Sequence, residues 1–86
     1  MKLKLTLTAL TLGLSGLTAQ AQVEIQWWHS MGGALGEWVN DHAKDFNASQ
    51  TQYKVVPTFK GSYDESMTAA IAAFRAGNAP YILQVF

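Results

Sequence analysis

The chain has 86 residues, of which six are Lys or Arg, six are Asp or Glu and none is Cys. This length accommodates one small domain at most, and the balanced charge excludes both a basic nucleic-acid-binding surface and an acidic tail. The absence of Cys excludes disulfides, a thiolate zinc site and a cysteine nucleophile.

Residues 1–21 have the three parts of a secretory signal peptide. Two lysines make the start basic, residues 5–17 carry no charge, and residues 19–21 read A-Q-A, which is an A-x-A cleavage pattern. The uncharged stretch is too short for a membrane span, which needs about 20 residues. A buried core helix is the alternative interpretation. We expect cleavage after Ala21 and export to the periplasm, which leaves four basic and six acidic residues in the mature segment.

The mature segment begins with a predicted strand and helix. Residues 23–27 alternate apolar and polar side chains, which is the period of a half-buried strand. Residues 29–36 contain three glycines and predict a turn, and residues 47–50 are expected to end the helix that follows it. Between them, apolar side chains recur at helical spacing. We expect this stripe, and Trp38 in particular, to lie in the core: Leu35, Trp38, Val39, Ala43 and Phe46.

A second strand and a second helix follow. Residues 53–60 again alternate, and Pro57 cannot donate to a sheet ladder, so this strand is predicted at an edge. Ser62 and Glu65 have the S-x-x-E spacing of a capping box, which predicts the start of a helix. Gly77 suits the left-handed position that ends one. The stripe expected to be buried in this helix is Met67, Ala70, Ile71 and Phe74.

Residues 81–86, YILQVF, form a nearly continuous apolar run, typical of a strand covered on both faces. The resulting β-α-β-α-β order indicates an α/β fold with a parallel sheet. The common strand order 2-1-3 would place Pro57 at an edge and the strand of residues 81–86 inside. Because three strands make a small core, we expect residues 22–86 to be the first part of a larger lobe. The alternative is a free-standing small domain.

Candidate binding residues lie at the ends of the predicted strands. Open parallel sheets bind ligands beyond the carboxyl ends of their strands, and the loops there each open a helix whose N-terminus favours phosphate or carboxylate. Tyr63 is the principal candidate, because its phenol can donate a hydrogen bond and its ring can lie against a carbon skeleton. The further candidates are Trp28, His29, Ser30 and Ser62.

The sequence contains no recognisable catalytic or metal-binding pattern. Ser30 is not part of a G-x-S-x-G elbow, and the glycines after it match neither a dinucleotide fingerprint nor a P-loop. His29 and His42 have no second ligand at metal spacing, and loop packing is the simpler interpretation of His29. We therefore expect a non-enzymatic protein without a metal or cofactor.

Three segments resemble one protein family. They are WHSM at 28–31, YKVVPTFKGSY at 53–63 and AAIAAFRAGNAP at 69–80. Together they are similar to the extracellular solute-binding proteins of ABC importers. The third segment marks the wider family, which includes sugar binders, whereas the first two resemble its glycerol-phosphate-binding branch.

The resemblance implies a periplasmic-binding-protein-like fold of two lobes that close on a ligand like a hinge, with residues 22–86 as the first part of the N-terminal lobe. It implies capture of sn-glycerol 3-phosphate, and in related proteins glycerophosphodiesters, and delivery to an inner-membrane permease with its ATPase. Tyr63 matches a ligand-contacting tyrosine of the family. We expect a monomer when the protein is full-length and no nucleic-acid partner. A sugar or oligosaccharide binder is the alternative within the family, and a secreted enzyme on a similar sheet is the alternative outside it.

Overall fold

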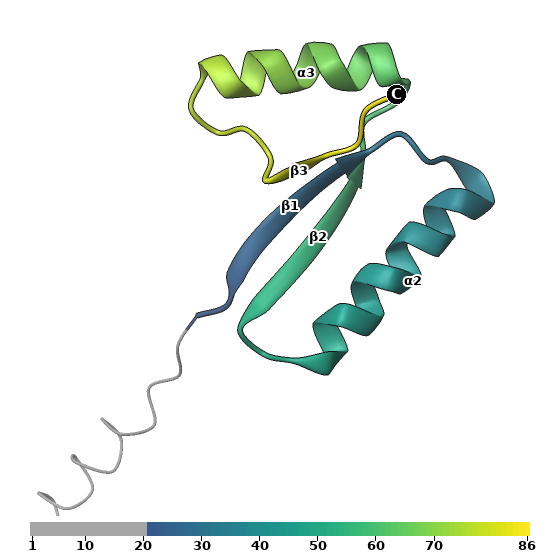
Figure 1. Ribbon diagram of the computed structural model, residues 1–86, viewed down its shortest axis with the longest axis vertical. Coiled ribbons are helices and arrows are strands. Elements are labelled where there is room, and N and C mark those ends of the chain that lie inside the picture. The colour runs from purple at the N-terminus through teal and green to yellow at the C-terminus, as the bar shows by residue number, and fades with distance from the viewer. Residues whose placement is uncertain (1–20) are drawn as a thin grey trace, which may run out of the picture.

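The computed structural model describes residues 21–86, which form two helices and three strands (Figure 1). In chain order these are β1 (Val23–His29), α2 (Gly33–Ser49), β2 (Tyr53–Phe59), α3 (Tyr63–Arg75) and β3 (Ile82–Leu83). The predicted β-α-β-α-β order and α/β class are therefore confirmed. The expected signal peptide lies outside the described residues, except for Ala21. Neither helix in the described part combines the length and apolar character that a membrane crossing requires.

The three strands form one parallel sheet in the order β2-β1-β3. β1 pairs with β2 along its whole length, from Val23 opposite Tyr53 to His29 opposite Phe59. The predicted strand order and the edge position of Pro57 are confirmed. Within residues 21–86, β3 forms the other edge and is two residues long, so the predicted length of a strand over residues 81–86 is wrong. Among the described residues β3 pairs with β1 alone, through Ile82 and Leu83.

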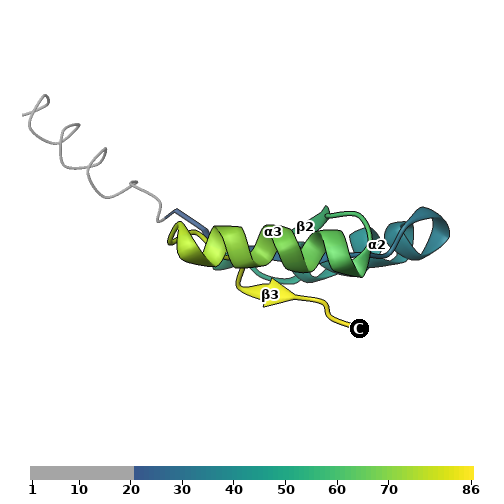
Figure 2. The same ribbon diagram turned by 90° about the horizontal axis from the view of Figure 1, so that it is seen from above.

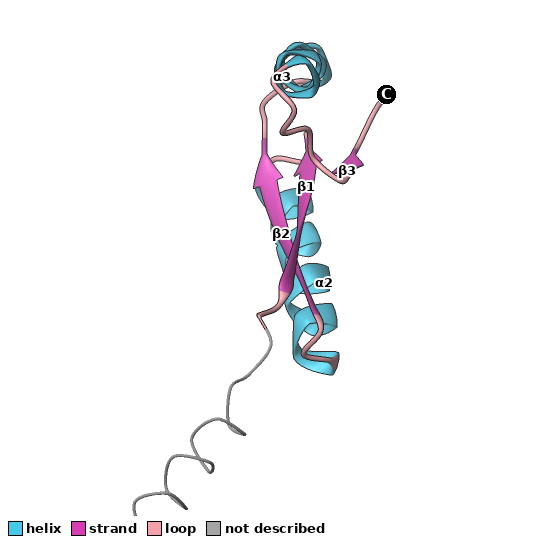
Figure 3. Cartoon of the chain, turned by 90° about the vertical axis from the view of Figure 1, so that its left-hand side faces the viewer, coloured by secondary structure: helices cyan, strands magenta, loops and turns pink. Residues whose placement is uncertain are grey.

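The two helices take different positions relative to the sheet. α2 runs beside β1 and β2 and packs against β2 (Figures 1 and 3). α3 lies across the carboxyl ends of these strands, and in Figure 3 it is seen end-on above them. Viewed from above, α3 covers the middle of the sheet and β3 emerges at its side (Figure 2). The start of α3 is thereby placed where parallel-sheet proteins bind their ligands.

α2 is longer at both ends than the sequence predicts. It begins at Gly33, which has a φ of 56°, and it continues through Asn47 to Ser49. The Asn47 side-chain amide donates to the Val55 carbonyl (2.9 Å) and accepts from the Val55 N–H (2.8 Å). Asn47 therefore covers backbone groups on the outer side of β2, which an edge strand would otherwise leave unpaired, instead of ending the helix.

Both ends of α3 have the motifs that the sequence predicts. At the start, the Ser62 hydroxyl accepts from the Glu65 N–H (3.1 Å) and the Glu65 carboxylate accepts from the Ser62 N–H (3.0 Å). At the end, Asn78 N–H bonds to the Ala73 carbonyl and Gly77 N–H to the Phe74 carbonyl. This pair of bonds, with Gly77 at a φ of 81°, is a Schellman motif.

The apolar core of the described part is small. Its buried apolar side chains are Val39, Ala43 and Ala70, and its buried polar residues are His29 and Ser66. Most of the stripes expected to be buried are exposed, including Trp38 (56% exposed) and Phe74 (76% exposed). Helical periodicity identifies the apolar face, but within residues 21–86 no element covers these side chains. The others that contradict the expectation are Leu35, Phe46, Met67, Ile71 and most of residues 81–86.

We predict that a peptide of residues 22–86 does not unfold cooperatively, because a core of this size cannot offset the conformational entropy of the ordered chain. The measurement is thermal circular dichroism of the isolated peptide. A sigmoidal, reversible transition would contradict this expectation and would favour the free-standing domain.

Candidate functional site

The three strands end at the same edge of the sheet, and backbone hydrogen bonds continue beyond them. The Lys60 N–H donates to the His29 carbonyl and the Gln84 N–H donates to the Trp28 carbonyl, both at 2.9 Å. The loops after β1, β2 and β3 are thus tied together at the carboxyl edge. All five candidate residues lie on or beside this edge: Trp28, His29, Ser30, Ser62 and Tyr63.

Two of the candidates, Trp28 and Ser30, lie at the end of β1 in different environments. Trp28 is half-buried, and the Lys60 ammonium lies 4.0 Å from the centroid of its ring. The Ser30 N–H donates to the Gln84 side-chain oxygen (2.9 Å), while the Ser30 hydroxyl is buried without a hydrogen-bond partner within the described residues. The Ser30 backbone is therefore fixed, and its hydroxyl retains its hydrogen-bonding capacity.

His29 is packed inside the fold. Its side chain is 3% exposed, and its ring lies 6.1 Å from Trp27 and 6.0 Å from Phe59, between centroids. Its Nδ1 accepts from the Met31 N–H (3.2 Å), which places the proton of the neutral ring on Nε2. Burial lowers the pKa of His29 below its ordinary value, in keeping with this neutral form. His29 shapes the turn that leads into α2.

The start of α3 is held by a tight arrangement around Gly61. Gly61 has a φ of 89°, and the Glu65 carboxylate folds back over it, so that a Cβ at this position would lie 2.8 Å from Glu65 Oε1. The hydrogen bonds from Ser62, first from its backbone and then from its side chain, hold the pKa of Glu65 below its ordinary value. The backbone conformation therefore favours glycine at position 61, and a Cβ there would also displace the Glu65 carboxylate.

Tyr63 is the first residue of α3 and is partly exposed. Its ring contacts that of Phe86 edge-on, with 5.5 Å between the centroids. Figure 1 shows the same proximity, since the end of the chain lies next to the start of α3. The segment that follows β3 therefore reaches the same edge as the loops that follow β1 and β2.

The two helix N-termini at this edge differ in charge. α3 is capped by Ser62 and carries Asp64 and Glu65 in its first turn. α2 has Gly32 as its N-cap, no side-chain cap and no acidic residue in its first turn. The positive end of the helix dipole is thus offset by carboxylates in α3 but remains uncompensated in α2.

Two residues of this edge were missed by reasoning from the sequence. The alternation over residues 53–60 predicts only that Lys60 ends a strand, although a basic residue directly before the glycine and serine of a capped helix is a detectable signal. Gln84 is the one polar residue in the apolar run of residues 81–86, which is also a signal. Neither pattern reveals the contacts with Trp28 and Ser30, which are distant in sequence.

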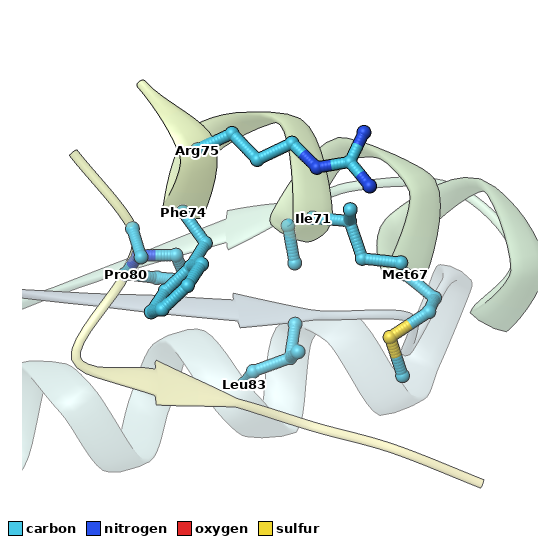
Figure 4. Close-up of a pocket in the computed structure, with 8 residues that line it drawn as sticks. Met67, Ile71, Phe74, Arg75, Pro80 and Leu83 are labelled. Carbon is cyan, nitrogen blue, oxygen red and sulfur yellow. The ribbon is translucent and has the colours of Figure 1, made fainter. Parts of the chain in front are cut away.

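An apolar groove of about 470 Å³ separates α3 from β3 (Figure 4). Half of its lining residues belong to the stripe expected to be buried in this helix, with Met67, Ile71 and Phe74 facing Leu83. The Arg75 side chain runs back along α3 (Figure 4) and lies in the last turn, as expected for a basic residue at the negative end of the dipole. Within residues 21–86, no three His, Asp or Glu side chains are grouped closely enough to hold a metal ion.

Comparison with known proteins shows what the chain as a whole is similar to. No protein-family model matches the chain. Curated relatives, however, are similar to nearly all of it, and they confirm the resemblance to the periplasmic solute-binding proteins that the three sequence segments predict.

The relatives are sn-glycerol-3-phosphate-binding periplasmic proteins, named UgpB. The protein of Escherichia coli strain K12 is 54% identical over 82 residues, or 94% of this chain. That of Escherichia coli O1:K1 is 53% identical over 85 residues, or 98% of this chain, and that of Shigella flexneri serotype 5b is 54% identical over 82 residues. The chain spans 19% of the length of each of these relatives, which agrees with the expectation of a piece of a longer protein.

We predict that Gly61→Ala destabilises the full-length protein by about 1–3 kcal/mol, which is the usual cost of a side chain in a left-handed conformation. The new Cβ would also push the Glu65 carboxylate away from position 61. Gly33→Ala is the matched control, since Gly33 has a positive φ but no atom within contact distance of its Cβ position. Denaturant titrations compare the two variants. An equal loss in both would show that the contact with Glu65 contributes nothing.

We also predict that acid weakens the start of α3 through Glu65. Because the pKa of Glu65 is lower in the folded than in the unfolded state, its stabilising contribution is complete above its ordinary value of 4.5 and is lost as the pH falls through the folded value. Glu65→Gln is expected to remove this part of the pH dependence. Unfolding titrations at a series of acidic pH values measure it, and identical pH profiles for the variant and the unsubstituted protein would refute the assignment.

Proposed function

We propose that this chain is part of the N-terminal lobe of a periplasmic solute-binding protein that captures sn-glycerol 3-phosphate and delivers it to an ABC permease and its ATPase. In this proposal, residues 1–21 direct export and are removed, and residues 22–86 supply one wall of the binding site. The full-length protein acts as a monomer, and its function is binding rather than catalysis. The observation that carries the proposal is the identity of 53–54% with binding proteins of that name across 94–98% of the chain.

The position of Tyr63 supports the proposal. It lies at the carboxyl edge of a parallel sheet, where ligands of such sheets bind. Its phenol is a hydrogen-bond donor for a phosphate or hydroxyl oxygen, and the capping box fixes the turn that carries it. Trp28, Ser30 and Ser62 lie at the same edge. His29 acts indirectly in this proposal, through the turn that its Nδ1 stabilises.

The size of the site argues for a second lobe. Micromolar affinity corresponds to about 8 kcal/mol of binding free energy, whereas one hydrogen bond to a charged group contributes about 1.5–3 kcal/mol. The residues of this edge therefore provide only part of a site. Closure of a second lobe over the ligand would supply the remaining donors and exclude water.

The aromatic side chains support one alternative, a neutral sugar as ligand. Trp28, Tyr63 and Phe86 offer rings at one edge, and aromatic side chains are common in sugar-sized pockets. The uncompensated N-terminus of α2 favours an anion instead. Binding measurements with both kinds of ligand separate these possibilities.

We predict that Tyr63→Phe weakens binding of sn-glycerol 3-phosphate by the mature full-length protein about tenfold or more, because one hydrogen bond to a charged group is lost. Tyr53→Phe is the matched control, since Tyr53 lies at the opposite end of β2. Isothermal titration calorimetry gives both affinities, with maltose as the control ligand. Equal affinities for the two variants would exclude the Tyr63 contact, and binding of maltose alone would support the sugar alternative.

A further inference from the structure

We propose that Lys60 provides the positive charge of this half of the site and thereby selects an anionic ligand over a neutral one. The inference rests on the proposed function and deepens it, because it assigns a specificity-determining role to a residue next to Tyr63. Three observations lead to it: the position of Lys60, the contact that holds its side chain, and the charges around it.

Lys60 differs in position from the other basic residues of the described part. It directly follows β2, and its N–H bonds to the His29 carbonyl at 2.9 Å. Lys44 lies in the second half of α2, Lys54 near the start of β2, and Arg75 in the last turn of α3. Of the lysines and arginine in residues 21–86, Lys60 is thus the one at the carboxyl edge.

The Lys60 side chain is held in place rather than extended into solvent. Its ammonium lies 4.0 Å from the centroid of the Trp28 ring, within the range of a cation–π interaction. Trp28 is opposite Thr58 in the register, and Lys60 lies two residues beyond Thr58, on the same face of the sheet. Because the contact already restricts a flexible side chain, less rotamer entropy is lost when an anion binds.

The carboxylates near Tyr63 would repel an anionic ligand, and the Lys60 ammonium offsets that repulsion. Asp64 and Glu65 stand in the first turn of α3, next to Tyr63. Their carboxylates repel a phosphate that approaches the Tyr63 phenol, and they offset the dipole of this helix. Lys60 is the first residue of the short loop that leads into α3, so its charge opposes this repulsion. A neutral ligand could accept a hydrogen bond from Lys60 but would gain no charge compensation from it.

The test uses the mature full-length protein and two variants that remove the charge, Lys60→Gln and Lys60→Met. Lys60→Met retains most of the aliphatic stem, so it separates loss of charge from loss of packing. Lys60→Arg keeps the charge and the stacking. Lys54→Gln is the matched control, because it removes an exposed lysine from the other end of the same strand.

We expect both charge-removing variants to bind sn-glycerol 3-phosphate about tenfold or more weakly in calorimetry, as for other charge-assisted contacts. They should also lose part of the salt dependence of binding, since added NaCl screens the attraction between Lys60 and an anion that approaches the open site. Lys60→Arg should remain within about threefold of the unsubstituted protein, and Lys54→Gln should match it.

Different outcomes separate this inference from the proposed function. If Lys60→Met and Lys60→Gln bind like Lys54→Gln, the role of Lys60 is overturned and the proposed function stands. If the unsubstituted protein does not bind sn-glycerol 3-phosphate, both are overturned. If Lys60→Gln lowers the thermal unfolding midpoint and Lys60→Met does not, the binding data of Lys60→Met alone test the role of Lys60. Unchanged affinity and unchanged salt dependence in Lys60→Met would then overturn the inference.

Discussion

The structure depends on the hydrogen bonding of β1 to a parallel strand on each side. β1 pairs with β2 through seven residues and with β3 through two. Because all three strands are parallel, this pairing places the residues after each strand at one edge. The contacts of Lys60 with Trp28, of Gln84 with Ser30 and of Phe86 with Tyr63 all follow from it. A shift of one residue in either pairing would turn the side chains of that strand to the opposite face.

The candidate site combines a rigid frame with a helix that is fixed locally. The frame is the end of the sheet, where backbone hydrogen bonds continue past the strands. Tyr63 belongs to α3, whose start is fixed by Gly61, Ser62 and Glu65 rather than by a large packed interface. The position of Tyr63 therefore depends on three local features: a glycine in the left-handed conformation, a serine N-cap, and the glutamate carboxylate that accepts from the N-cap backbone.

Local features of the fold could be predicted from the sequence. The alternation in β2, the S-x-x-E spacing and the position of Gly77 each depend on residues close in the chain, and the structure confirms them. The parallel order also followed, because β-α-β connections leave few topologies. The position of Tyr63 at the carboxyl edge is a consequence of these local rules.

Features that depend on distant partners could not be predicted in the same way. Helical periodicity marked the faces of α2 and α3 but did not show whether anything covers them, and Trp38 and Phe74 are exposed. Asn is a residue type that often ends helices, yet Asn47 lies within α2 and its side-chain amide pairs with the backbone of Val55. The contacts of Lys60 and Gln84 require the strand register, which is specified only when the sheet is assembled.

The most direct test of the proposed site is a crystal structure of the mature full-length protein grown with sn-glycerol 3-phosphate. The proposal predicts that the ligand lies at the carboxyl edge of β1 and β2, with the Tyr63 phenol within hydrogen-bond distance of one of its oxygens. A ligand bound elsewhere, with Tyr63 covered by other parts of the protein, would contradict it.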